Sequence, residues 1–128
     1  MKNMIQFLML VMMCLLPLSA KADNEPRIYV EKDSISVGTL GPNVRKVFLE
    51  VPIRNTGNSP LTIYKIKTDC ICTRTKFERT PVAPGEKKII NVDIEIEPFF
   101  TGENTKSIMI YSNAIEQQKQ IFFTFTIE

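Results

Sequence analysis

The chain contains no histidine and no tryptophan among its 128 residues. Without histidine it can form neither a Ser-His nor a Cys-His nucleophile pair, and it offers no imidazole ligand to zinc. Its three cysteines are too few for a closed four-cysteine zinc site. The formal net charge is only +2, which does not indicate the basic patch of nucleic-acid-binding proteins. We therefore expect no nucleic-acid partner.

The first residues of the chain have the three-part pattern of a secretory signal peptide. Lys2 supplies the positive charge, residues 7–16 form an unbroken apolar run, and residues 20–22 (Ala-Lys-Ala) resemble a cleavage site. The apolar run is shorter than the roughly 20 residues that a membrane-spanning helix needs. We predict a signal peptide over residues 1–22, and a secreted mature domain over residues 23–128 without a membrane span. The expected location is the periplasm or cell envelope of a Gram-negative bacterium. A retained anchor helix is the alternative.

Cleavage at this point removes one of the three cysteines. Cys14 lies in the apolar run, and Met13 before it is not the small residue expected ahead of a lipid-carrying cysteine. We therefore expect no lipid there. Cys70 and Cys72 remain, in a compartment that is expected to be oxidising.

Alternation of apolar and polar residues with a period of two dominates the mature part. One face of each such segment can be buried while the other meets water, which is typical of antiparallel sheets covered on one side. No window shows a helical stripe. The segments expected to be strands are 28–31, 34–37, 46–54, 61–67, 90–96, 107–111 and 121–127.

Turn-forming residues separate these segments. Residues rich in glycine, proline and asparagine lie at 55–60, 81–85, 102–104 and 112–113. Short strands divided by such turns predict an all-β fold, an immunoglobulin-like antiparallel β-sandwich of about seven strands, with an up-and-down barrel as the alternative. Because tryptophan is absent, isoleucine and phenylalanine must fill the core.

Two irregularities in the strands are expected. Pro52 cannot donate to a ladder, which indicates a sheet edge or a bulge at that residue. Leu61 and Ile63 have the same parity while Ile66 has the other, so we expect a β-bulge near residues 64–65.

Several of these turns together resemble a known family. The pattern reads Asn55-Thr56-Gly57, Pro60-Leu61, Asp69-Cys70-Ile71-Cys72-Thr73, Pro84-Gly85, Gly102 and Ser112-Asn113. It resembles the bacterial domain-of-unknown-function family 1573, a group of exported immunoglobulin-like domains similar to PapD-like and Hydin-type sandwiches. Ile71 stands where the family motif has glycine. The resemblance implies the sandwich fold and supplies no established enzyme activity.

Cys70 and Cys72 are the main candidates for chemistry, and several interpretations stay open. In an extended strand their Cα atoms lie roughly 6.6 Å apart, near the upper limit for a disulfide. A bend would shorten this distance, but the β-branched Ile71 resists left-handed conformations. The pair could form a disulfide, hold a soft metal ion such as Cu(I), or take part in thiol–disulfide exchange. The interpretation that we favour is two separate thiols packed as small hydrophobes.

Other side chains suggest less. Asp93 and Glu95 share one face of an expected strand, where solvation explains them more simply than glycosidase chemistry does. Phe99 and Phe100 are adjacent in an expected loop, so they form an exposed contact patch or one of them covers the end of the core.

These observations favour a binding protein over an enzyme. We predict a non-catalytic, exported immunoglobulin-like protein–protein interaction module, with no catalytic residues, no cofactor and no metal site. Its protein partner is unknown, and a strand edge offers a route to a weak homodimer or to strand addition. The alternative is a thiol-based redox or copper-binding periplasmic protein that uses Cys70 and Cys72.

Overall fold

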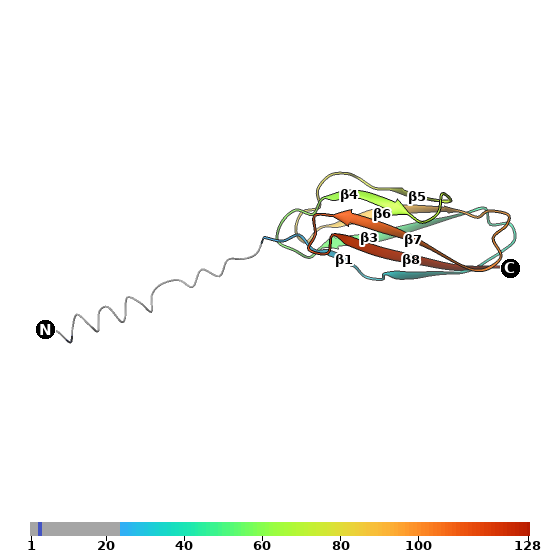
Figure 1. The fold of residues 1–128 in the computed structure, drawn as a ribbon, viewed down its shortest axis with the longest axis horizontal. Helices are drawn as coiled ribbons and strands as arrows, with labels where there is room; N and C mark the ends of the chain where they lie inside the picture. The colour runs from blue at the N-terminus through green and yellow to red at the C-terminus, as the bar shows by residue number, and fades with distance from the viewer. Residues whose placement is uncertain (1–2, 4–23) are drawn as a thin grey trace.

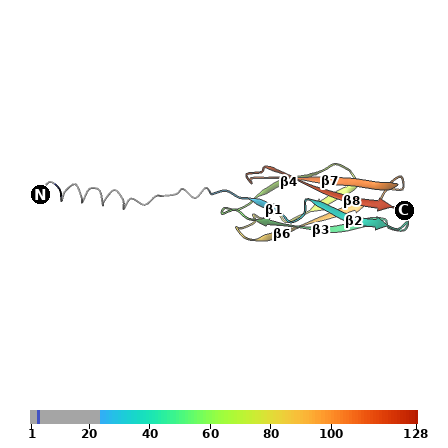
Figure 2. The same cartoon turned by 90° about the horizontal axis from the view of Figure 1, so that it is seen from below.

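Residues 24–128 fold into two facing β-sheets (Figure 1). The structure is a computed structural model that describes Asn3 and residues 24–128, so Cys14 and the predicted signal peptide, apart from Asn3, lie outside the described residues. One sheet has the order β1-β3-β6-β5 and the other β2-β8-β7-β4, and Figure 2 shows the two layers from the side. The strands are β1 (Ile28–Val30), β2 (Ser34–Leu40), β3 (Lys46–Asn55), β4 (Ile63–Thr68), β5 (Thr73–Lys76), β6 (Lys87–Glu95), β7 (Gly102–Ser112) and β8 (Gln118–Ile127).

The predicted all-β sandwich is confirmed, with two differences in its topology. The segment 73–76 forms a strand that the alternation did not predict, because it contains no apolar residue. It is extended because it pairs with β6. In addition, β2 pairs with β8 in parallel, whereas we expected antiparallel sheets throughout. The chain leaves the first sheet after β1 and joins the second sheet as β2, so one pair runs in the same direction.

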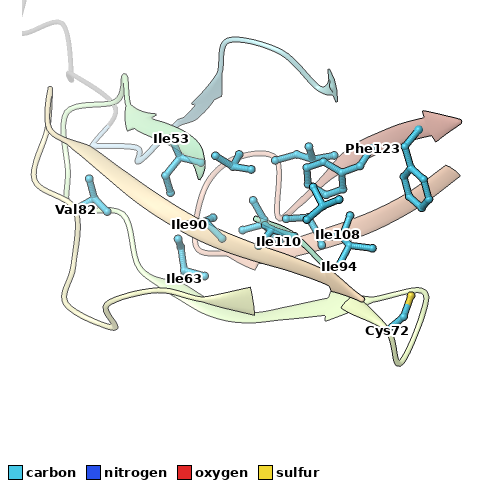
Figure 3. Close-up of a cluster of buried hydrophobic side chains, with 14 of the residues drawn as sticks. Ile53, Ile63, Cys72, Val82, Ile90, Ile94, Ile108, Ile110 and Phe123 are labelled. Atoms are coloured by element: carbon cyan, nitrogen blue, oxygen red, sulfur yellow. The ribbon is translucent and has the colours of Figure 1, made fainter. Parts of the chain in front are cut away.

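Inward-facing side chains of both sheets fill the core, as the alternation predicts. Along β6, for example, Ile90, Val92 and Ile94 are fully buried, while the residues between them lie on the outer face. Isoleucine and phenylalanine are prominent among the largest fully buried side chains (Figure 3). Each such side chain contributes about 1.5–3 kcal/mol when it is removed from water.

Both predicted irregularities occur. The register between β4 and β7 shifts between Ile63 and Lys65, which places the β-bulge at Tyr64. Pro52 lies in an unexpectedly central strand, but β1 pairs with β3 only over residues 53–55. On that side, β3 therefore has an open edge at Pro52.

Asn55 connects three segments at the end of the sandwich where residue 24 enters. Its side chain is fully buried. The Oδ1 atom accepts hydrogen bonds from the backbone N–H of Arg27 at 3.3 Å and of Gly57 at 2.9 Å. The Nδ2 group donates to the carbonyls of Ser59 at 2.7 Å and of Val82 at 2.9 Å. One side chain thus satisfies backbone groups that come from three separate parts of the sequence.

The N-terminal segment also packs tightly on Gly57. A Cβ atom at this position would lie 2.0 Å from the carbonyl oxygen of Glu25 and 2.6 Å from the nitrogen of Arg27. Neighbouring backbone bonds run from Thr56 N–H to the Arg27 carbonyl at 3.0 Å and from Asn58 N–H to the Glu25 carbonyl at 3.1 Å. Only glycine allows the two segments to approach this closely.

Candidate functional site

The two cysteines lie in the short connection between β4 and β5. Because β4 belongs to one sheet and β5 to the other, this connection crosses the side of the sandwich. Cys72 marks the end of the core that is farther from Ile53 and Val82 (Figure 3). The turn therefore lies toward the end of the sandwich opposite to the entry of the N-terminal segment (Figure 1).

Cys70 and Cys72 are joined by a disulfide bond, and their Cα atoms are 5.1 Å apart. The expectation of two separate thiols is therefore wrong. That expectation assumed that residues 70–72 are extended, whereas they form a turn. The N–H of Thr73 donates to the Cys70 carbonyl at 3.1 Å, which closes a four-residue turn. No non-glycine residue in the described part of the chain has a positive φ. Ile71 is accommodated because this turn does not need a left-handed residue.

Hydrogen bonds fix the turn to both sheets. Asp69 lies beside β7, where its N–H donates to the Ser107 carbonyl at 3.3 Å and its Oδ1 accepts from the Ser107 N–H at 3.0 Å. On the other side, the N–H of Glu95 in β6 donates to the Cys72 carbonyl at 2.8 Å. The Thr68 hydroxyl donates to the Cys70 carbonyl at 3.1 Å. The turn is thus held in one conformation by groups on each side of it.

The three side chains of the turn differ sharply in exposure. Cys72 packs into the core with 2% of its surface exposed, and Cys70 is half-buried against the same cluster. Ile71 between them is 97% exposed. A β-branched apolar side chain thus projects into solvent from a turn whose two flanking residues are covalently joined.

The disulfide limits what the cysteines can do chemically. Bonded sulfurs provide no thiolate, so metal binding or attack on another disulfide would first require reduction. Within the described part of the chain, no three residues of the types His, Cys, Asp or Glu are clustered as metal ligands. The soft-metal and thiol-exchange interpretations of Cys70 and Cys72 stay predictions.

Phe99 and Phe100 divide between solvent and core. Phe100 is buried, its ring centroid lies 6.4 Å from that of Phe125, and the Lys106 ammonium lies 4.5 Å from the Phe100 centroid. Phe99 is 74% exposed and meets Phe100 edge-on at 5.0 Å. The expectation that one ring covers the end of the core is confirmed for Phe100, while Phe99 faces solvent and its role in a contact patch stays a prediction.

Asp93 and Glu95 lie on the outer face of β6, in line with the expected solvated face. In register, Asp93 is opposite Phe48 on one side and Arg74 on the other. Both carboxylates are partly exposed.

Removing both cysteines should destabilise the fold only modestly. The bond closes a ring of three residues (70–72), for which loop-closure entropy gives about 1.6 kcal/mol. We expect Cys70→Ala/Cys72→Ala to lower the free energy of unfolding by about 2 kcal/mol, measured by urea denaturation. Wild-type protein under reducing conditions is the matched control and should lose a similar amount. A loss above about 4 kcal/mol would identify the bond as a main support of the fold.

A comparison with known families and proteins places this geometry in context. The family model described as "Protein of unknown function (DUF1573)" matches residues 28–127. No curated protein matches the sequence. No helix in the described residues is long and apolar enough to cross a membrane.

Three solved structures illustrate what the fold is similar to. A protein of unknown function from Porphyromonas gingivalis W83 has 16% identity and a TM-score of 0.71, over 84% of this chain and 50% of that one. The VesB protease of Vibrio cholerae has 11% identity and a TM-score of 0.59, over 82% of this chain and 32% of the protease. A PapD-like domain of human CEP192 has 8% identity and a TM-score of 0.58, over 82% of this chain and 86% of that domain. This chain spans half of the first structure and a third of the second. The likenesses confirm a PapD-like, immunoglobulin-type sandwich.

Proposed function

The chain belongs to the DUF1573 family of proteins of unknown function, and on this premise we propose that it acts as a non-catalytic, exported protein–protein interaction module of the bacterial cell envelope. The observation that carries the proposal is Ile71, which is almost fully exposed on a turn held by a disulfide and by both sheets. The absence of histidine from the whole sequence supports a binding role over a catalytic one.

An exposed apolar side chain on a rigid turn is well suited to anchor a partner. Binding normally costs conformational entropy, because loops and side chains are ordered at the interface. Here the disulfide and the backbone hydrogen bonds of the turn have already ordered the backbone at Ile71. Burial of its side chain in an apolar pocket of a partner would then contribute mostly to affinity. This gives the disulfide a role beyond its small effect on folding.

Export to the periplasm or cell envelope is supported by two features. Residues 1–22 have the pattern of a signal peptide. The Cys70–Cys72 disulfide is of a kind that persists in oxidising compartments. Intact mass of the protein recovered from the producing cell tests this directly. The expected mass is that of residues 23–128 less two hydrogen atoms, and a mass that retains residues 1–22 would contradict it.

The interaction itself is tested at Ile71. A photo-crosslinking residue at position 71 should identify the partner in cells. With that partner purified, Ile71→Ser should raise the Kd at least tenfold, because a central anchor residue contributes about 2 kcal/mol or more. Its free energy of unfolding should change by less than about 0.5 kcal/mol, since the side chain is exposed.

Ile115→Ser is the matched control, because Ile115 is 51% exposed in the loop between β7 and β8. It should leave the Kd within about twofold. Equal losses of affinity for the two variants would exclude the turn as the contact.

A thiol-based redox role is the second candidate, because the two sulfurs are bonded. The partly exposed Cys70 is the sulfur that an attacking thiolate can reach more easily, while Cys72 is buried. Alkylation of newly exported protein, followed by intact mass, distinguishes the two roles. A permanently oxidised pair supports the interaction module, whereas a reduced fraction that varies with growth conditions supports the redox role.

A further inference from the structure

The side of the sandwich that carries the turn is also basic. Strands β4 and β5 are the edge strands of their sheets on this side, and they contact one another (Figure 1). They contain four cationic residues and no acidic one: Lys65, Lys67, Arg74 and Lys76, here called the basic flank. We propose that the basic flank binds an acidic polypeptide in extended conformation, which adds as a strand to the free edge of β4. This deepens the proposed interaction function by naming the chemistry of a partner.

The positive charge is concentrated on the outer face of β4. The ammonium groups of Lys65 and Lys67 lie 4.8 and 5.6 Å from the ring centroid of Tyr111. In register, these lysines are opposite Tyr111 and Met109, so the neighbouring strand β7 places no carboxylate against them. Among the described residues, none of the four cations forms a salt bridge. Two ammonium groups over one ring favour an anionic ligand.

On β5 the charge is partly compensated. Arg74 is opposite Asp93 of β6 in register, whereas Lys76 is opposite the neutral Asn91. The carboxylate nearest to β4 in sequence, Asp69, already accepts a hydrogen bond from the Ser107 backbone. The lysines of β4 have no carboxylate opposite them, whereas Arg74 of β5 has one. An acidic ligand would therefore join β4.

The free edge of β4 has a defined length. At one end, Leu61 forms a bridge with Val82, and at the other the chain enters the cysteine turn. Between them lie the six residues 63–68, which correspond to about 20 Å of strand. Their edge has no partner strand in the described structure. This length suits a short extended peptide.

The alternation of β4 also defines the preferred ligand sequence. Lys65 and Lys67 lie on the outer face, whereas Ile66 between them packs against the core and pairs with Ile110. In an added strand, residues beside the lysines would be acidic and those beside Ile66 would be apolar. A second copy of this chain fits poorly in antiparallel pairing, because its own lysines would meet these lysines.

The test is an NMR titration of the full chain with a peptide of alternating glutamate and valine. Amide shifts should centre on residues 63–68 and weaken as salt is raised, because surface charges are screened. Lys65→Glu/Lys67→Glu should raise the Kd about tenfold, since two favourable cross-strand charge pairs become repulsive. Lys46→Glu/Lys87→Glu makes the same change in net charge on the other sheet and should leave the Kd within about twofold.

Three outcomes would overturn the proposal. A peptide of alternating lysine and valine that binds equally well would exclude charge recognition. Amide shifts centred on β2 would place the strand at another edge. Binding to vesicles that contain phosphatidylglycerol, without binding of the acidic peptide, would make the basic flank a lipid-binding surface. Ile71 lies outside residues 63–68. If the acidic peptide does not bind, the crosslinking experiment at Ile71 therefore still tests the proposed interaction function on its own.

Discussion

Replacing Asn55 with alanine should lower the free energy of unfolding by about 4 kcal/mol. The substitution leaves two N–H groups, of Arg27 and Gly57, without their acceptor. It also leaves the Ser59 carbonyl without a donor, whereas the Val82 carbonyl keeps the backbone N–H of Leu61. Each buried polar group that loses its partner costs about 1–3 kcal/mol, and water can reach only some of these groups. Chemical denaturation followed by fluorescence or circular dichroism measures the change.

Asn58→Ala provides the matched control. Asn58 also binds the N-terminal segment, through its Oδ1 and the N–H of Glu25 at 2.8 Å, but this hydrogen bond is exposed. We expect a loss of at most about 1 kcal/mol, because solvent replaces the lost partner. If the two variants were equally stable, the buried network around Asn55 would not be a principal support of this end of the sandwich.

The second large effect is expected at Phe123. This ring is fully buried between the sheets, and truncation to alanine removes most of a large side chain from the core. Phe123→Ala should cost about 4 kcal/mol, from lost transfer free energy and from the cavity that remains. Thermal and urea unfolding should both report the loss.

Phe122→Ala is the control, because the neighbouring ring is 39% exposed on the opposite face of β8. Its expected cost is about 1 kcal/mol, from partial burial alone. A cost at Phe122 that matches the cost at Phe123 would contradict the register of β8 in the structure, in which the two side chains face opposite sides.

Most of the fold could be predicted from the sequence, because alternation determines which side chains are buried. The prediction is confirmed along β6 and β8. The change in alternation between Ile63 and Ile66 also predicted the bulge at Tyr64. Alternation carries no information about strand direction, so the parallel pairing of β2 with β8 was missed. Strand β5 has no apolar residue, and its conformation depends on a neighbour 15 to 21 residues away in the sequence, as Lys76 pairs with Asn91 and Thr73 with Ile94.

The candidate site could be predicted only in part. The cysteine pair was recognisable, but its bonded state depends on the turn closed by Thr73 and on the bonds of Asp69 to Ser107. The exposure of Ile71 follows from that turn. The one available signal was that isoleucine stands where the related motif has glycine. The sequence predicts Asn55 only as a turn residue. Its role as the centre of a hydrogen-bond network depends on Arg27 and Val82, which are distant in sequence and adjacent to it only in the fold.

The parallel pairing of β2 has a consequence for the order in which the protein is made. Ser34 pairs with Phe122, 88 residues later, so β2 has no partner strand until the last strand has been synthesised. At ribosomal rates this delay is roughly 4 to 18 seconds. During it, the uncharged sequence Ser-Ile-Ser-Val-Gly-Thr-Leu has neither a neighbour nor a charge to keep it apart from other chains. Until β8 is available, β2 is therefore an unpaired strand prone to aggregation, and a truncation that removes β8 would make that state permanent.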